Sequence, residues 1–346
     1  MLASPPSTRR VVAVVAATVA ALGLAVVFGL VIGPTSISTS RILGNVFSYV
    51  GIGHSTLTSL QSSIVWQLRA PRMVLGLLAG AMLAVAGGTY QGVFRNPLAD
   101  PYLLGVAAGA GLGATLAIVN IAHGSSVPTW TPVLAFVGAM VAVVLTWVIG
   151  GRSLRSTPAT LVLAGVAISA LFTSAQTFLQ QQSSTQSIAR VYIWLLGSLS
   201  NANWRSVVIV LPYVVVCGAV CVLAGRALDV MSVGDDEARS LGLSVSTLRL
   251  VVVAASSLGT AAIVSVVGLI GFVGIIVPHI TRLLVGTSYR RILPISVVFG
   301  AAFLVLCDTV ARTVMAPSEL PLGVVTAVIG APVFVVILSV RRMGTP

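Results

Sequence analysis

The densest group of reactive side chains in this sequence is acidic. Four of its seven carboxylates, Asp229, Asp235, Asp236 and Glu237, lie within nine positions. The apolar residues around them are spaced as in two short amphipathic helices broken at Gly234. We therefore expect residues 227–246 to form a docking surface for a partner protein. A solvated loop with incidental charges is the alternative.

Arginine supplies the second group. Arg69, Arg72 and Arg312 flank apolar segments on the side that, by the orientation argued below, faces away from the cytoplasm. The planar guanidinium binds a carboxylate through two parallel hydrogen bonds, so these residues are candidates for binding acidic groups of a partner. Contact with lipid headgroups is the alternative.

Other chemistry is excluded by what the sequence lacks. All 19 basic residues are arginine, whereas a Walker A phosphate loop and an imine-forming enzyme both require lysine. The spacing of His, Cys and carboxylate residues matches no metal site, and nothing pairs a nucleophile with a base. We expect a non-catalytic chain without a metal or cofactor of its own. If it uses ATP, another polypeptide must supply the site.

The composition indicates where such a chain resides. Of 346 residues, 57% are apolar and 8% are charged, against about 25% charged in soluble domains. The apolar residues form long runs, which predicts an all-α polytopic membrane protein. About ten windows are long enough to span a bilayer, at residues 11–33, 72–92, 101–121, 130–150, 157–179, 204–225, 247–266, 268–286, 291–311 and 320–340.

The arginines predict the orientation of these spans. With the N-terminus inside, 13 arginines lie on the inner side and six on the outer side, so both termini are expected in the cytoplasm. The net charge of +12 is explained by this bias rather than by nucleic-acid binding. Only 32 residues separate Arg249 from Arg282, so the two spans there must be short or extend into the headgroups. Glycines four residues apart, such as Gly76 and Gly80, predict close helix packing.

Several motifs, in order along the whole chain, carry a family resemblance. They are Arg69-x-Pro71-Arg72, Gln91, Arg95-Asn96-Pro97-Leu98-Ala99, Leu163-Ala164-Gly165, Trp194-Leu195-x-Gly197-Ser198, Gly234-x-x-x-Ala238-Arg239-x-Leu241-Gly242, Phe272-Val273-Gly274, Pro278-His279, Arg282, Asp308, Arg312, Glu319-x-Pro321-x-Gly323 and Gly330-x-Pro332-x-Phe334. Together they resemble the FecCD-like permeases of iron–siderophore and cobalamin ABC importers.

The resemblance implies one transmembrane domain over residues 1–346 with the type II importer fold, in a bacterial cytoplasmic membrane. It implies a pore between two permease subunits, two ATPase subunits that hold ATP and magnesium, and a periplasmic or lipid-anchored binding protein. The loop 227–246 is similar to the family's coupling helices. The residues implied in contact with the ATPase are Gly234, Asp235, Glu237, Ala238, Arg239, Leu241 and Gly242. Arg69, Arg72 and Arg312 resemble the sockets for glutamates of the binding protein.

The pore is less well defined. The resemblance places the span 157–179 along it, so Gln176, Gln180 and Thr157 are candidates for lining it. In the family a constriction lies near the start of this span. Here Pro158 departs from the expected pattern, which leaves the gate residue unassigned.

The expected substrate is a ferric siderophore, passed as a chelate rather than as a bare ion. Cobalamin or haem, carried by permeases of the same family, is the alternative. An ion-coupled secondary transporter would need acidic residues within the spans, and Asp308 is the one candidate. Asp308 lies four residues before Arg312, a helical pairing distance. Glu319 is also expected to pair with Arg312.

Overall fold

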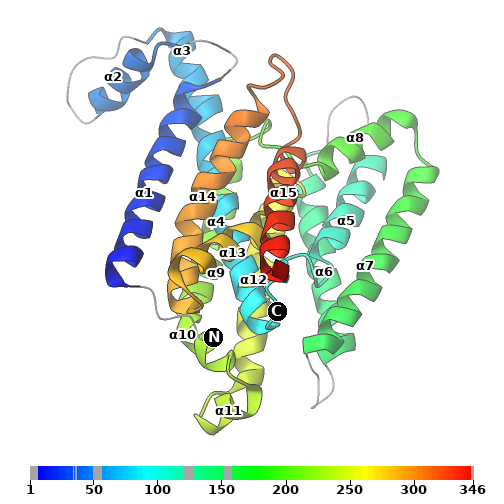
Figure 1. The fold of residues 1–346 in the computed structure, drawn as a ribbon. Coiled ribbons are helices and arrows are strands. Elements are labelled where there is room, and N and C mark those ends of the chain that lie inside the picture. The colour runs from blue at the N-terminus through cyan, green and yellow to red at the C-terminus, as the bar shows by residue number, and fades with distance from the viewer. Residues whose placement is uncertain are drawn as a thin grey trace.

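The computed structural model describes residues 7–33, 35, 37–49, 57–120, 128–151 and 158–343, and these residues contain helices and no strand. In chain order the helices are α1 (Thr8–Val31), α2 (Thr39–Tyr49), α3 (Ser59–Ser63), the π-helical turn η1 (Ile64–Arg69), α4 (Ala70–Val93), α5 (Val106–Asn120), α6 (Thr131–Gly151), α7 (Pro158–Gln181), α8 (Thr185–Leu195), α9 (Trp204–Leu223), α10 (Gly225–Met231), α11 (Asp235–Ser240), α12 (Val245–Val267), α13 (Val273–Val285), α14 (Tyr289–Ala311) and α15 (Leu322–Met343). Figure 1 shows their arrangement.

The all-α membrane fold is confirmed, and a helix occupies each of the ten predicted windows. Seven of the described helices are long and apolar enough to cross a membrane, whereas α5, α13 and the described apolar part of α15 are shorter. Between Arg249 and Arg282, α12 keeps a full 23 residues and α13 has 13. The shortening predicted for this interval therefore falls on α13.

Helix α4 forms the centre of the bundle, where it packs against α14, α12, α13 and α9. Its small residues permit this, as the sequence predicted. A Cβ atom on Gly80 would lie 2.1 Å from the carbonyl oxygen of Gly300 on α14, and one on Gly87 would lie 1.9 Å from that of Gly274 on α13. Since lipid gives helices no hydrophobic drive to associate, such backbone contact is a main source of their packing energy.

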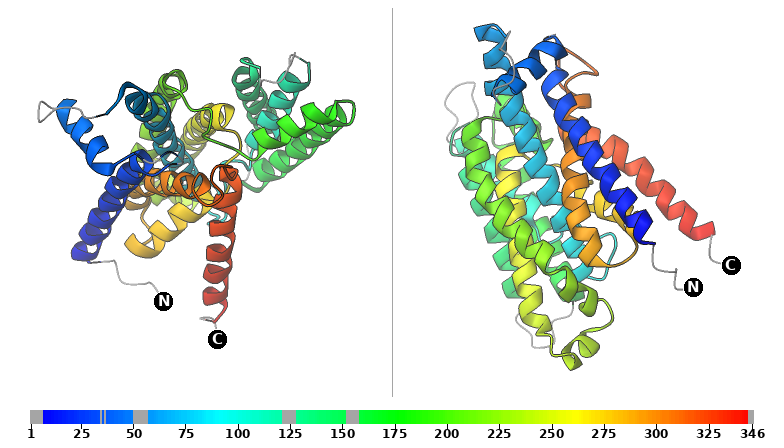
Figure 2. Two further views of the ribbon diagram at one scale, coloured as in Figure 1. Left: turned by 90° about the horizontal axis from the view of Figure 1, so that it is seen from above. Right: turned by 90° about the vertical axis from the view of Figure 1, so that its left-hand side faces the viewer.

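A second group of helices, α5, α6 and α7, pack on one another and are joined to the centre through α12. Seen from above, this group lies to one side of the molecule and α1 to the other, while α15 projects outward between them (Figure 2). The pairing within the group again uses glycine, because a Cβ atom on Gly109 of α5 would lie 2.3 Å from the carbonyl oxygen of Gly138 on α6.

Short helices mark the two ends of the bundle. Helices α10 and α11 extend beyond it at one end, called here the α11 end, and α2, α3 and α8 lie at the other, the α8 end (Figure 1). The prediction of two short helices broken at Gly234 is confirmed, since α10 ends at Met231 and α11 begins at Asp235. Helices α2 and α8 were not predicted.

The connection between α12 and α13 is buried at Gly268 and Ile270 and half-buried at its other three residues. Its residue Ile270 is 2% exposed. The hydroxyl of Tyr102, from the connection between α4 and α5, donates to the carbonyl oxygen of Ile270 at 2.9 Å and accepts from its N–H at 3.2 Å. One side chain thus satisfies both backbone groups of this residue.

Candidate functional sites at the two ends of the bundle

At the α11 end, Asp229 of α10 holds the start of α14. Its carboxylate accepts hydrogen bonds from the backbone N–H of Tyr289 and, at 2.7 Å, from the hydroxyl of Ser288. The N–H of Arg290 also points to it at 3.4 Å. The first N–H groups of a helix have no partner within the helix and carry partial positive charge, so a carboxylate is well suited to this position. Asp229 therefore fixes α10 to α14.

Asp235 attaches α11 to the bundle through ion pairs with two arginine side chains. It accepts from Arg95 and, at 2.9 Å, from Nη2 of the buried Arg249. Burial alone would raise the pKa of Asp235, but the hydrogen bond and charge of Arg249, with the charge of Arg95, hold it below its ordinary value. Arg95 also donates from Nε to the carbonyl oxygen of Met231 at 3.0 Å. These contacts join α10 and α11 to α4 and α12.

The predicted ATPase-contact residues divide into two groups by exposure. Gly234 and Ala238 are buried and Asp235 is half-buried, whereas Glu237, Arg239, Leu241 and Gly242 are exposed. Leu241 and the neighbouring Val233 are each 73% exposed, and Arg239 pairs with the exposed Asp236 at 2.6 Å. The surface available to a partner is thus two apolar side chains among charges, and the other three residues support it from inside.

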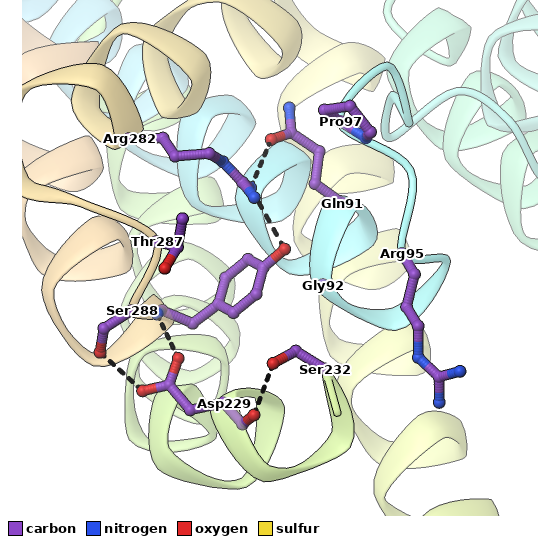
Figure 3. A pocket seen from close by; sticks show the side chains of 10 residues that line it. Gln91, Gly92, Arg95, Pro97, Asp229, Ser232, Arg282, Thr287 and Ser288 are labelled. Atoms are coloured by element: carbon purple, nitrogen blue, oxygen red, sulfur yellow. Dashed lines mark hydrogen bonds between the residues drawn. The ribbon is translucent and has the colours of Figure 1, made fainter. Parts of the chain in front are cut away.

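A chain of hydrogen bonds runs from this segment into the bundle, past a cavity of about 580 Å³ (Figure 3). Nη2 of Arg282 on α13 donates to Oε1 of Gln91 on α4 at 3.2 Å and to the hydroxyl of Tyr289 at 3.1 Å. The guanidinium carbon lies 5.1 Å from the centre of the Tyr289 ring. Since Asp229 binds the backbone of Tyr289, helices α10, α14, α13 and α4 are linked in sequence.

At the α8 end, the structure brings Arg69, Arg72 and Arg312 together around a cavity of about 240 Å³. Arg72 binds two carboxylates. It donates to Asp308 from Nη2 at 2.8 Å and from Nε at 3.0 Å, and to Glu319 from Nη1 at 2.8 Å and Nη2 at 2.9 Å. The expected pairing of Glu319 with Arg312 is therefore wrong, because the connection between α14 and α15 places Glu319 against Arg72 of α4.

Arg69 and Arg312 are almost fully buried, at 5% and 3% exposure. Arg69 donates to the carbonyl oxygens of Leu30 and Val31 at 2.9 and 2.8 Å. Arg312 donates to the carbonyl oxygen of Gly29 at 3.0 Å and lies 3.3 Å from Asp308, which confirms the predicted helical pair. Arg72 and Arg312 thus enclose Asp308, so its carboxylate is fully engaged within the protein.

The three pore candidates lie in different surroundings. Gln176 is buried against α5, where a Cβ atom on Gly111 would lie 2.7 Å from its Oε1. Gln180, one turn further along α7, is half-buried. Thr157 lies outside the described residues. Their role in a pore stays a prediction.

Sequence reasoning did not single out Arg249, Arg282 or Tyr289 as partners in these contacts. Each contact joins two different helices, so no spacing within one helix predicts it, and Arg249 carried no signal beyond its place at the start of a span. Asp229 was identified as part of the acidic cluster. Its contact with α14, 60 positions away, could not be predicted from the local sequence pattern.

The chain is similar to known proteins along nearly its whole length. The FecCD transport family matches residues 21–340. The cobalamin import system permease protein BtuC of Halobacterium salinarum is 42% identical over 280 residues, 81% of this chain and 74% of that protein. The Fe(3+)-citrate import system permease protein YfmE of Bacillus subtilis is 37% identical over 310 residues, 89% of each chain. A solved structure, described as an inward-facing conformation of a transporter provisionally assigned to the metal-chelate ABC type, has a TM-score of 0.81 at 30% identity and covers 94% of this chain and 98% of that one. The chain therefore belongs to the FecCD transport family of ABC importer permeases.

Proposed function

We propose that this permease imports a ferric siderophore across the cytoplasmic membrane of a bacterium, driven by ATP hydrolysis on separate subunits. The similarity to the Fe(3+)-citrate permease YfmE over 89% of both chains supports an iron chelate. The second candidate is cobalamin, supported by the 42% identity with BtuC. An ion-coupled mechanism is disfavoured, because the carboxylate of Asp308 is held by Arg72 and Arg312.

The α11 end is proposed as the cytoplasmic end, where the two ATPase subunits bind. The orientation argued from the sequence places 13 arginines on the same side of the membrane as residues 227–246 and six on the other side, as the positive-inside rule requires. The exposed residues Val233, Glu237, Arg239 and Leu241 offer an apolar contact surrounded by charges. Movement of the ATPases would reach the spans through the contacts of Asp229 and Asp235.

The α8 end is proposed to receive the binding protein through Arg69, Arg72 and Arg312. Their three positive charges face two carboxylates, Asp308 and Glu319, so the cluster retains a net positive charge. Glu319 is the more exposed of the two acids, with 30% of its side chain accessible against 4% for Asp308. A carboxylate of the binding protein could replace Glu319 on Arg72. A second permease subunit completes the pore in this proposal.

The substrate is tested by transport into proteoliposomes that contain the permease, its ATPase and its binding protein. We expect ATP-dependent uptake of ⁵⁵Fe-loaded siderophore that persists with a protonophore and stops when ADP replaces ATP. Radiolabelled cobalamin under the same conditions is the comparison. Uptake of cobalamin but not of iron would overturn the ferric substrate, and uptake that needs a proton gradient instead of ATP would overturn the ATP-driven mechanism.

A further inference from the structure

A groove separates α6 from α9, and α12 forms its floor. Both helices pack against α12, and the space between them holds a cavity of about 380 Å³. The part of this cavity nearest the middle of the bundle is lined by apolar residues from all three helices, Val133, Phe136, Ile209, Tyr213, Ala262 and Val266.

The groove is closed at its inner limit and open to the side. The rings of Phe136 and Tyr213 meet across it, with centroids 5.8 Å apart. Ile209 in its wall is 50% exposed. On the floor, the hydroxyl of Ser265 is engaged as a donor to the carbonyl oxygen of Ala262 at 2.8 Å. An occupant of this part therefore meets a mainly apolar surface, with the hydroxyl of Tyr213 as a polar group in the wall.

The rim of the groove at the α8 end is polar and positively charged. Thr129, Asn203, Arg205 and Ser206 line the same cavity, and an adjoining cavity of about 450 Å³ shares much of this lining and adds Arg190 and Ser200. Arg205 is exposed. All seven acidic residues belong to the part of the chain that the structure describes, and none of them forms an ion pair with Arg205.

We propose that this groove binds a phospholipid with an anionic headgroup, whose acyl chain lies between α6 and α9 and whose phosphate contacts Arg205. The groove is mainly apolar along its floor and positive at its rim, and a lipid of the outer leaflet has the complementary chemistry at this depth. An apolar helix of another subunit would leave the charge of Arg205 without a partner.

The headgroup must decide which lipid binds. An acyl chain gains no hydrophobic energy when it moves from the bilayer into an apolar groove, because both surroundings are hydrocarbon. The contact between an arginine and an anionic lipid is worth about 1 kcal/mol, a preference of about fivefold over a zwitterionic lipid with the same chains. The bound lipid would fill the space between α6 and α9 and support the outer half of α12.

The test uses the full-length permease in nanodiscs made from equal amounts of dioleoyl phosphatidylglycerol and dioleoyl phosphatidylcholine. After extraction into mild detergent, native mass spectrometry measures which lipid stays bound. We expect about one phosphatidylglycerol per chain. Ile209→Trp fills the groove from its exposed wall and should abolish retention. Val208→Trp, at a neighbouring position that is 67% exposed and does not line the groove, should retain the lipid.

Arg205→Gln should keep a lipid bound but reduce the preference for phosphatidylglycerol about fivefold. Arg41→Gln, which removes an exposed arginine on α2, should leave the preference unchanged. Equal retention by Ile209→Trp and the unmodified protein would overturn the groove as the site, and an unchanged preference in Arg205→Gln would overturn the headgroup contact. Cross-linking between two copies through Ile209→Cys would show that a second permease covers this face, and would also overturn the proposal.

Discussion

Asp229 of α10 binds the backbone N–H of Tyr289, the first residue of α14, across 60 positions of sequence. The side chain of the same Tyr289 binds Arg282 of α13. Tyr289 thus contacts the proposed coupling segment through its backbone N–H and helix α13 through its side-chain hydroxyl.

Asp229→Ala should uncouple ATP hydrolysis from transport. It leaves the N–H groups at the start of α14 without their acceptor, and loss of such a cap costs about 1 kcal/mol. We expect more ATP hydrolysed per substrate transported in the reconstituted importer. Asp236→Ala, which removes an exposed carboxylate of the same segment, is the control. If Asp229→Ala leaves the amount of ATP hydrolysed per substrate transported unchanged, movement of the ATPases must reach the spans through other contacts.

Reversal of two charges should prevent binding of the ATPase. The double substitution Glu237→Arg and Arg239→Glu keeps the net charge of α11 but exchanges the sign at two exposed positions. We expect the ATPase to be lost when the permease is purified by affinity, because like charges would then face each other across the contact. ATPase binding that survives this exchange would contradict the assignment of α11.

The attachment of α11 should weaken only in acid. The pKa of Asp235 is lowered in the folded protein, so its ion pairs contribute stability that is present above its ordinary pKa, about 4, and is lost as pH falls through the lower folded value. We expect hydrogen-exchange protection of α11, corrected for intrinsic rates, to stay constant from pH 8 to pH 5. Asp235→Asn should lack this protection at pH 7. A loss of protection between pH 7 and pH 5 in the unmodified protein would refute the prediction.

Glu319→Gln should strengthen binding of the binding protein, if a carboxylate of that protein replaces Glu319 on Arg72. Removal of the competing charge leaves Arg72 more available, and we expect severalfold tighter binding in a surface-plasmon measurement. Arg72→Gln should weaken binding. The model of exchange fails if Glu319→Gln binds no more tightly than the unmodified permease while Arg72→Gln still reduces affinity.

Gly80→Ala should destabilise the bundle, because its methyl group would meet the carbonyl oxygen of Gly300 at 2.1 Å. Forcing an extra carbon into a packed contact costs about 1–3 kcal/mol, visible as a lower Tm in detergent. Gly218→Ala on α9 has no atom within 4 Å of the added Cβ and should leave Tm the same or raise it. Equal Tm values for the two variants would mean that α4 and α14 can separate at little cost.

Local patterns in the sequence were sufficient where the structure is local. The ten apolar windows, the two helices about Gly234 and the pairing of Asp308 with Arg312 all depend on neighbours within a few turns. The predicted pairing of Glu319 with Arg312 was wrong because the partner of Glu319 is distant in the sequence. Its partner Arg72 lies 247 positions away, and only the packing of α4 against α14 brings the two together.

The contact between Tyr102 and Ile270 has a consequence for how the bundle tolerates its lipid surroundings. Helix α13 has 13 residues and is about 20 Å long, whereas the hydrocarbon layer is about 30 Å thick. At least one end of α13 therefore lies within the hydrocarbon layer, where unsatisfied peptide groups are costly. The hydroxyl of Tyr102 both donates to and accepts from Ile270, as a water molecule would. The tyrosine hydroxyl thus takes the place of a bound water molecule and lets a transmembrane helix end within the bilayer.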